Sequence, residues 1–237
     1  NRMATEIRET DASRRRLLTD ISHELRGPLA NLRSQIEAME DGLLTADSAG
    51  LESLHEETML LARLVDDLHE LTLADTQSLR LEPGPVKPAR LVDAAVTPLR
   101  PALRAQDIDL VVDAPRHLAT VYADEQRMGQ VLRNVLQNAL RYAPGGAITV
   151  IASERDGRVA FSISDTGAGI RDEDLERIFD RFYRPDPSRS RASGGSGLGL
   201  AIARALVHAH GGEIFAEANV PQGLVVTITL PVANRTP

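Results

Sequence analysis

Asp165-Thr-Gly-Ala-Gly-Ile170 directly follows Arg158–Ser164, a stretch in which apolar and polar residues alternate. Alternation with a period of two predicts a half-buried strand, so the aspartate should stand at the end of that strand. A carboxylate there can accept a hydrogen bond from an exocyclic amine, while Gly167 and Gly169 let the backbone approach a flat base. The segment indicates either a nucleotide-base site or a plain glycine-rich turn.

A second glycine-rich stretch, Gly194-Gly-Ser-Gly-Leu-Gly-Leu200, opens a predicted helix that extends to His210. Free N–H groups at a glycine-lined helix start attract anions without any lysine. This matters because the only lysine of the chain, Lys87, lies in a proline-rich stretch. It fits neither the G-x-x-x-x-G-K-[ST] phosphate loop nor the V-A-I-K strand of Ser/Thr/Tyr kinases. The stretch is therefore a phosphate site of another kind or a flexible loop before a helix.

Two asparagines, Asn134 and Asn138, stand four residues apart on a predicted helix over Arg127–Tyr142, so their amides share one face. The amide oxygen of Asn138 could bind Mg²⁺, an ion that usually keeps bonds to water and substrate phosphates. Alone, such a pair is typical of a solvated helix surface. Together with the two glycine-rich stretches, it indicates a nucleotide site in the second half of the chain.

The rest of the second half mixes helical and strand periods. A helix is predicted over 91–103, and strands over 108–112, 147–152, 213–218 and 224–230. The strands 147–152 and 158–164 should form a hairpin around Asp156-Gly157. Helices layered on one mixed or antiparallel sheet make an α+β two-layer sandwich. The breaker cluster over 82–88 precedes it, which predicts two domains, 1–82 and 83–237.

The first domain has the heptad-like apolar spacing of long helices that are packed along their whole length. The expected stripes are Leu18, Ile21, Leu25, Leu32, Ile36, Met39 and Leu43, followed by Leu51, Leu54, Thr58, Leu61, Val65 and Leu68. Asp41-Gly42 predicts the end of the first helix, and Asp47 or Ser48 the N-cap of the second. Because a lone hairpin buries only one seam, an all-α dimeric four-helix bundle is expected.

Composition excludes several function classes. The absence of cysteine excludes disulfides, Cys-ligated metals and thiol catalysis. Residues 1–82 carry 9 arginines against 17 acidic residues, whereas residues 83–237 carry 18 basic and 17 acidic residues, a split that favours two modules. No basic block is interleaved with aromatic residues, so no nucleic-acid partner is expected. No apolar run approaches the roughly 20 residues of a membrane helix.

In their order along the chain, the motifs resemble those of two-component sensor histidine kinases. The ATPase domain of that family is of the kind shared by gyrase, heat-shock-90 chaperones and mismatch-repair proteins. The matching motifs are Ile21-Ser-His-Glu-Leu-Arg-Gly-Pro-Leu29, Asp124 with Gln130, Asn134–Tyr142, Asp165–Ile170, Ile178-Phe-Asp-Arg-Phe-Tyr-Arg184 and Gly194–Leu200. Residues 1–12 resemble the end of a membrane-proximal signalling segment. The resemblance thus implies the cytoplasmic catalytic part of a protein anchored in the inner or cytoplasmic membrane.

The resemblance also implies a site for ATP and Mg²⁺. Asp165 would bind the adenine amine, with Gly167 and Gly169 beneath the base. Asn138, with Asn134 nearby, would hold Mg²⁺ on the phosphates.

Two further segments are implied to contribute residues to the phosphate side of this site. Arg141 would contact phosphate oxygens, a task that suits the guanidinium geometry, and Tyr142 would pack beside the sugar or base. A lid from about Phe179 to Gly195 would cover ATP. The triphosphate would be lined by Gly195, Gly197, Leu198 and Gly199.

His23 is implied to be the phosphoacceptor. A neutral imidazole has one ring nitrogen with a free lone pair that can attack the γ-phosphorus, and Glu24 would take the proton of the other nitrogen as general base. The phosphoryl group would then pass to an aspartate of a response-regulator receiver domain docked near His23. The other histidines, which no motif surrounds, are expected on the surface: His55, His69, His117, His208 and His210.

Two positions depart from the family pattern. Gly27 stands four residues after His23, where the family usually has Thr or Asn to position a water molecule, so phosphatase activity is predicted to be weak or absent. Leu224 stands where many relatives have Thr and is expected to affect packing alone.

Two other functions compete with the kinase. A chaperone- or topoisomerase-like ATPase would need a carboxylate on the asparagine helix to activate water, but Arg133 and Gln137 precede the two asparagines. A non-catalytic dimerisation and docking module would not need an intact nucleotide site, and the presence of Asn138 and Asp165 with the glycine stretch argues against it.

Overall fold

The computed structural model describes residues 19, 21–22, 25–45, 47–75, 80–185 and 196–233. The chain divides into two compact units, Asn1–His69 and Glu70–Pro237. This division falls inside the long helix α2 (Ser48–Asp75), so the C-terminal end of α2 belongs to the second unit. Within that unit, Glu70 accepts hydrogen bonds from the side chains of Arg127 and Gln130. A functional boundary at residue 82 stays a prediction.

The N-terminal unit is a helical hairpin. Residues 25–40 are helical, and Gly42 follows with a φ of +72°, a left-handed conformation that favours glycine after a helix end. α2 begins after Asp47, whose Oδ1 accepts a hydrogen bond from the N–H of Gly50 at 3.0 Å. Of the two candidate N-caps, Asp47 is therefore the one that caps the helix.

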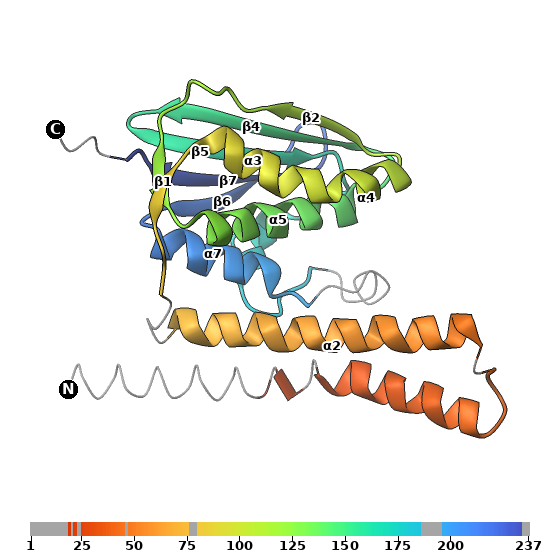
Figure 1. The fold of residues 1–237 in the computed structure, drawn as a ribbon. Coiled ribbons are helices and arrows are strands. Elements are labelled where there is room, and N and C mark those ends of the chain that lie inside the picture. The colour runs from red at the N-terminus through yellow and green to blue at the C-terminus, as the bar shows by residue number, and fades with distance from the viewer. Residues whose placement is uncertain are drawn as a thin grey trace. The chain divides into compact units, whose positions relative to one another are not determined.

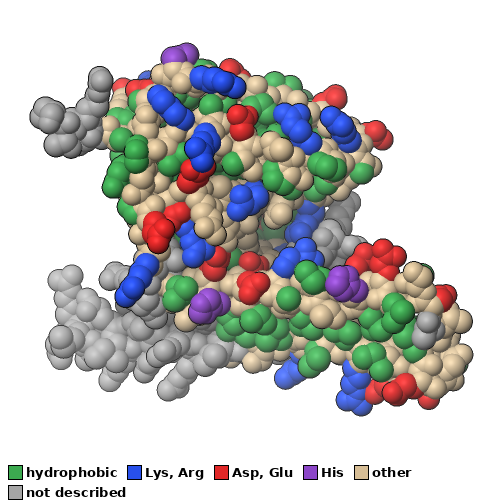
Figure 2. All heavy atoms as spheres, viewed as in Figure 1, with side chains coloured by type: hydrophobic (Ala, Val, Ile, Leu, Met, Phe, Trp, Pro, Cys, Tyr) green, Lys and Arg blue, Asp and Glu red, His purple; other side chains and the backbone are tan. Residues whose placement is uncertain are grey.

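The hairpin exposes apolar side chains in a single chain, among them Ile36, Leu43, Leu51 and Val65 of the expected stripes. Figure 2 shows hydrophobic side chains gathered along this hairpin. Its large hydrophobic side chains with at least 44% exposure are Leu29, Ile36, Leu43, Leu44, Leu51, Met59 and Val65. Such a surface is what a bundle of two hairpins would cover, and the dimer stays a prediction. Among the described residues, no helix combines the length and the apolar character needed to span a membrane.

The C-terminal unit is a five-stranded mixed sheet with helices on one face (Figure 1). The strand order is β2 (Asp109–Asp113), β4 (Ala147–Arg155), β5 (Arg158–Asp165), β7 (Leu224–Pro231) and β6 (Glu213–Ala218). β2 runs parallel to β4, and the other neighbouring strands are antiparallel. The covering helices are α3 (Pro88–Val96), α4 (Arg100–Ala105), α5 (Glu125–Tyr142) and α7 (Gly199–Ala209). The predicted α+β two-layer sandwich is confirmed.

Local sequence accounts for the main elements of this unit. Asp156 and Gly157 have φ values of +52° and +73°, which is the two-residue turn that matches the twist of a hairpin between β4 and β5. Asp124 is the N-cap of α5, and its Oδ1 accepts a hydrogen bond from the N–H of Arg127 at 3.1 Å. Its inward residues have at most 2% exposure: Met128, Val131, Leu132, Val135 and Leu136.

One strand lies where the sequence predicts only a breaker. β1 (Gly84–Val86) pairs antiparallel with β3 (Val121–Ala123) in a separate two-stranded sheet. Pro85 can occupy this strand because the two-stranded ladder leaves one of its edges unpaired. Lys87 follows directly, and its Nζ donates to the carbonyl of Leu118 at 3.2 Å. The chain's single lysine is thus used to hold a loop to this short sheet.

The expectation that the remaining histidines lie on the surface is wrong for one of them. His55, His69, His117 and His208 are exposed. His210 is half-buried, and both of its ring nitrogens are hydrogen-bonded. Nothing in its immediate sequence indicates this, because one partner lies 86 residues away.

Candidate nucleotide-binding site

Asp165 is the last residue of β5 and is almost fully buried, with 5% exposure. Its Oδ1 accepts a hydrogen bond from the N–H of Gly167 at 2.8 Å. Burial raises the pKa of this carboxyl above its ordinary value, although hydrogen bonds from the backbone of Gly167 and Leu224 act in the opposite direction. A fixed, buried acceptor of this kind can select an amine donor.

The backbone around Asp165 is packed too tightly for side chains at two glycines. A Cβ on Gly167 would lie 2.3 Å from the carbonyl oxygen of Tyr142, and a Cβ on Gly223 would lie 1.9 Å from the carbonyl oxygen of Asp165. Asn219 closes the same corner, with its Nδ2 donating to that oxygen at 2.7 Å. Sequence reasoning missed Asn219 and Gly223. The only signal was a glycine just before the last predicted strand.

Asn134 and Asn138 both lie half-buried on α5, as predicted, but their partners differ. Asn134 donates from Nδ2 to the carbonyl of Gly199 at 2.9 Å. Its nitrogen therefore joins α5 to the start of α7, and its oxygen is left for other contacts. The side chain of Asn138 makes no hydrogen bond to the described part of the chain. Further along the same helix, Arg141 is half-buried and Tyr142 is 40% exposed.

The glycine stretch leads into α7 as expected. Gly197 has a φ of +70°, and a Cβ there would lie 2.9 Å from the Cα of Phe182, so both conformation and space require glycine. Leu198 is buried with 1% exposure, and no side chain of the described residues caps the N-terminus of α7. An uncapped N-terminus presents N–H groups to an anion. Gly195 lies outside the described residues, as do His23 and Glu24.

The start of the predicted lid is anchored in the unit. Phe179 has 3% exposure and packs in the core, so it is not part of a covering segment. Phe182 donates from its backbone N–H to the carbonyl of Gly197 at 3.0 Å. This hydrogen bond joins the two ends of the segment that lies between Phe182 and Gly197. Residues 186–195 of the predicted lid lie outside the described part of the chain.

A buried carboxylate, Asp174, secures the same flank. It has 0% exposure and accepts hydrogen bonds from the hydroxyl of Tyr183 and from Nε of Arg171, the latter at 3.0 Å. The guanidinium of Arg177 lies 4.2 Å from the centre of the Tyr183 ring. The Tyr183 hydrogen bond, with help from both arginines, lowers the pKa of Asp174 against the effect of burial, and the same bond raises the pKa of Tyr183.

Replacing Tyr183 with phenylalanine should lower the thermal unfolding midpoint by a few degrees at neutral pH, because Asp174 loses a donor. A lowered Asp pKa contributes stability above the ordinary value of about 4, and a raised Tyr pKa contributes stability below about 10. The difference between wild type and variant should therefore be constant from about pH 5 to 9 and shrink as the pH falls below or rises above this window. Tyr122→Phe, at an exposed position of β3, is the control. If the difference in unfolding midpoint between wild type and Tyr183→Phe stayed the same down to about pH 2, the proposed role of the Asp174 carboxylate would be wrong.

The residues brought together suit ATP and a magnesium ion. Three features belong to the same unit: a buried carboxylate at the end of β5, an amide with no partner among the described residues, and a helix N-terminus that no described side chain caps. The amide oxygen of Asn138 is the kind of ligand that Mg²⁺ prefers, and it would leave most of the coordination to phosphates and water. The donor set therefore fits this ion.

Comparison with known proteins identifies both units. A family model described as "Histidine kinase-, DNA gyrase B-, and HSP90-like ATPase" matches residues 123–234, and one described as "His Kinase A (phospho-acceptor) domain" matches residues 13–77. The histidine-protein kinase BaeS of Escherichia coli is 39% identical over 233 residues, which cover 98% of this chain and 50% of BaeS. The chain thus spans about half the length of that relative.

Solved structures agree. The histidine kinase AdeS of Acinetobacter baumannii superimposes with a TM-score of 0.77 at 28% identity, covering 90% of this chain and 98% of that one. The histidine kinase ThkA, solved in complex with the response regulator TrrA, superimposes with a TM-score of 0.78 at 24% identity. The match covers 97% of this chain and 65% of ThkA, and it shows that the two proteins share a fold. With both family models in the family's order, the chain belongs to the sensor histidine kinases and carries their phosphoacceptor and ATPase domains.

Proposed function

We propose that this chain is an ATP-dependent protein-histidine kinase that phosphorylates its own His23. The observation that supports it most is the nucleotide site of the C-terminal unit, in which Asp165, Asn138 and the N-terminus of α7 offer an amine acceptor, a metal ligand and an anion site. The phosphoacceptor family model spans the segment that contains His23.

In the proposed complex, Asp165 accepts a hydrogen bond from the adenine amine, and Asn138 provides an oxygen to Mg²⁺. Bound there, Mg²⁺ neutralises charge on the phosphates. The N–H groups at the start of α7 and the guanidinium of Arg141 bind phosphate oxygens. Tyr142, which is 40% exposed, packs beside the sugar or base.

The proposed reaction is an in-line displacement at the γ-phosphorus. The free nitrogen lone pair of His23 forms the N–P bond while the bond from phosphorus to the bridging oxygen breaks, and ADP leaves with that electron pair. Glu24 accepts the proton of the second ring nitrogen, which keeps the product from carrying a full imidazolium charge. Such a reaction depends mainly on positioning and charge neutralisation.

The proposed partners are a second copy of the chain and a response regulator. The exposed apolar side chains of the hairpin support a homodimer. Transfer to an aspartate of a receiver domain is the chemistry expected of the family, and ThkA provides a solved complex of that type. The parent protein is proposed to be membrane-anchored, with this chain as its cytoplasmic part.

Incubation with γ-labelled ATP and Mg²⁺ distinguishes this function from its competitors. The kinase predicts protein-bound label that is stable in base and lost in acid. A chaperone-like ATPase predicts release of labelled phosphate with no label on the protein, and a docking module predicts neither. Absence of protein-bound label on folded, dimeric, ATP-binding protein would exclude the kinase.

Gly27 predicts weak dephosphorylation of the partner, because a residue without a side chain cannot position water. A Cβ at Gly27 would meet no atom within 4 Å, so Gly27→Thr should fit the helix and raise the dephosphorylation rate at least about fivefold in the presence of ADP, the order expected of one added hydrogen bond. Release of labelled phosphate from the phosphorylated regulator measures it. Gly27→Ala is the control, because it adds a Cβ and gains more helix propensity than threonine without adding a hydroxyl. Rapid dephosphorylation by the wild type, unchanged in Gly27→Thr, would refute the prediction.

A further inference from the structure

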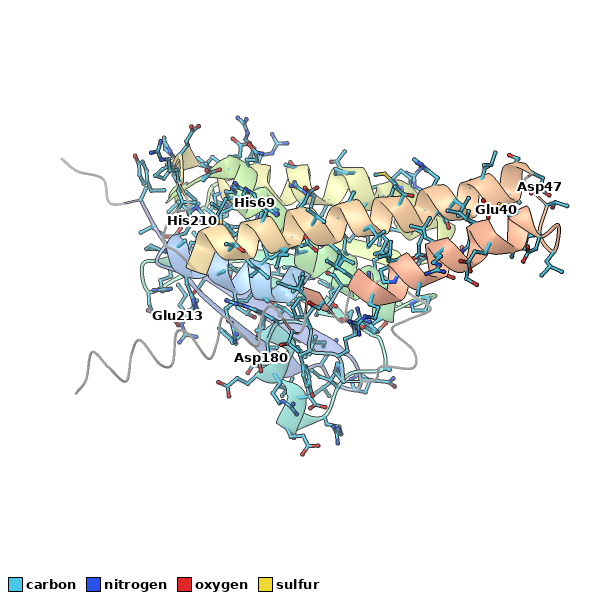
Figure 3. All side chains as sticks on the ribbon, turned by 90° about the horizontal axis from the view of Figure 1, so that it is seen from below. Glu40, Asp47, His69, Asp180, His210 and Glu213 are labelled. Atoms are coloured by element: carbon cyan, nitrogen blue, oxygen red, sulfur yellow. The ribbon has the colours of Figure 1, made fainter. Side chains whose placement is uncertain are left out.

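His210 joins the end of α7 to the beginning of α5. Its Nδ1 lies 2.7 Å from the carbonyl oxygen of Leu206, which can only accept, so Nδ1 carries the proton. Its Nε2 lies 3.1 Å from the backbone nitrogen of Asp124 and accepts that N–H. His210 lies at the C-terminal end of α7 in Figure 3. The contact with Asp124 requires an Nε2 without a proton, and the contact with Leu206 places the ring proton on Nδ1.

The partner of His210 is held firmly. Asp124 caps α5 by accepting the N–H of Arg127 on Oδ1, at 3.1 Å, and accepts the N–H of Glu82 on Oδ2, at 2.9 Å. Its own N–H is the donor to His210. The two hydrogen bonds of its carboxylate hold Asp124 in place independently of α7.

The backbone at the end of α7 is equally constrained. The N–H of Gly211 donates to His208 and that of Gly212 to Val207, each at 2.9 Å, and Gly211 has a φ of +69°. This is the glycine-dependent helix ending in which two final carbonyls are satisfied. A Cβ on Gly212 would lie 2.4 Å from the carbonyl oxygen of Thr229, so this position has room only for glycine, and β6 begins at the next residue. The ring of His210 is thus presented from a defined backbone.

A second hydrogen bond joins the middle of α5 to the other end of α7. Asn134 on α5 donates to the carbonyl of Gly199, the first residue of α7, at 2.9 Å. At 1.5 Å per residue, the segments Asp124–Asn134 and Gly199–His210 span about 15 Å and about 16 Å. Two side-chain hydrogen bonds at matching separations therefore fix how far α7 can slide along α5.

We propose that His210 is a positioning residue for ATP. His210 sets the axial register of α7 against α5. That register in turn determines the distance between the N–H groups at the start of α7 and Asn138. This inference rests on the proposed use of ATP by this unit. Because the register affects the phosphate end of the site and leaves the buried carboxylate of β5 in place, it governs affinity for the triphosphate and not for adenosine.

Two polar substitutions of His210, by glutamine and by asparagine, test the proposal because their side chains differ in length. The terminal oxygen of glutamine can occupy the place of Nε2 and accept the N–H of Asp124, whereas the side chain of asparagine is one methylene too short. Both are tolerated after a helix end, and the exposed His208 provides the matched control His208→Asn. The full chain is titrated with ATP and Mg²⁺, and separately with adenosine, while thermal unfolding is recorded for each variant.

We expect His210→Asn to weaken ATP binding about five- to tenfold, the range of one hydrogen bond, with adenosine affinity unchanged within about twofold. His210→Gln should stay within about threefold of wild type for both ligands. Equal loss of ATP and adenosine affinity, equal behaviour of the two variants, or no loss in either would overturn the proposal. Failure of the wild type to bind ATP would overturn the proposed function itself, and with it this inference.

Discussion

Replacing His23 with glutamine is expected to remove protein-bound label from γ-labelled ATP, a loss of about 10³-fold or more. Glutamine has nearly the length of histidine but no nitrogen lone pair that can attack phosphorus. Nucleotide binding should be unchanged, because the proposed ATP-binding residues all lie in the C-terminal unit. Label after acid and base treatment and ATP affinity are therefore measured on the same preparation.

His55→Gln is the matched control for this change. His55 is also on the helical hairpin and is exposed on α2, so the substitution repeats the chemical change in the same unit. Wild-type labelling is expected. If His23→Gln kept base-stable label at the wild-type rate, another side chain would be the acceptor, and the assignment of His23 would be wrong.

Asp165→Asn should weaken ATP binding about 10- to 100-fold, since a hydrogen bond to a charged acceptor contributes about 1.5–3 kcal/mol. The amide presents N–H groups where the carboxylate presents only acceptors, and it therefore opposes the adenine amine. The affinity for ATP, determined by titration at neutral pH, measures the effect. Asp113→Asn, at the exposed end of β2, is the control and should bind as the wild type does.

The pH dependence of ATP affinity separates the role of the Asp165 carboxylate from general damage. Burial raises the pKa of Asp165, so the group takes up a proton at a pH above the ordinary value of about 4. Because the ionised form is the one that accepts from adenine, wild-type affinity should decline as the pH falls toward that raised pKa. Asp165→Asn should lack this decline and keep only the changes due to the nucleotide itself. Identical pH profiles for both proteins would contradict the assignment.

The sequence predicts this fold well where local patterns decide the structure. The alternation of β5 is bounded by a turn with two positive φ values and places Asp165 at the strand end, and the period of α5 buries one face while presenting both asparagines. These features depend on neighbours two to four residues apart. Such short-range signals are sufficient to locate the asparagine helix, the carboxylate and the glycine stretch.

What the sequence does not predict depends on contacts between distant segments. β1 lies among prolines that suggest a linker, and its strand character comes from pairing with β3. His210 shows no motif because its partner is 86 residues away. Asp174 looks like one more surface acid in an acidic run, and only the fold brings Tyr183 over it. Long-range partners of this kind become visible only in three dimensions.

Lys87 has a practical consequence that follows from its place beside β1. It is the only lysine among 237 residues, and it is exposed while its ammonium group contacts the carbonyl of Leu118. A reagent that acylates amines therefore has a single side-chain target in this chain, and that target lies outside the residues proposed to bind the nucleotide. A fluorophore attached there would follow the C-terminal unit during labelling reactions without substitution of any residue.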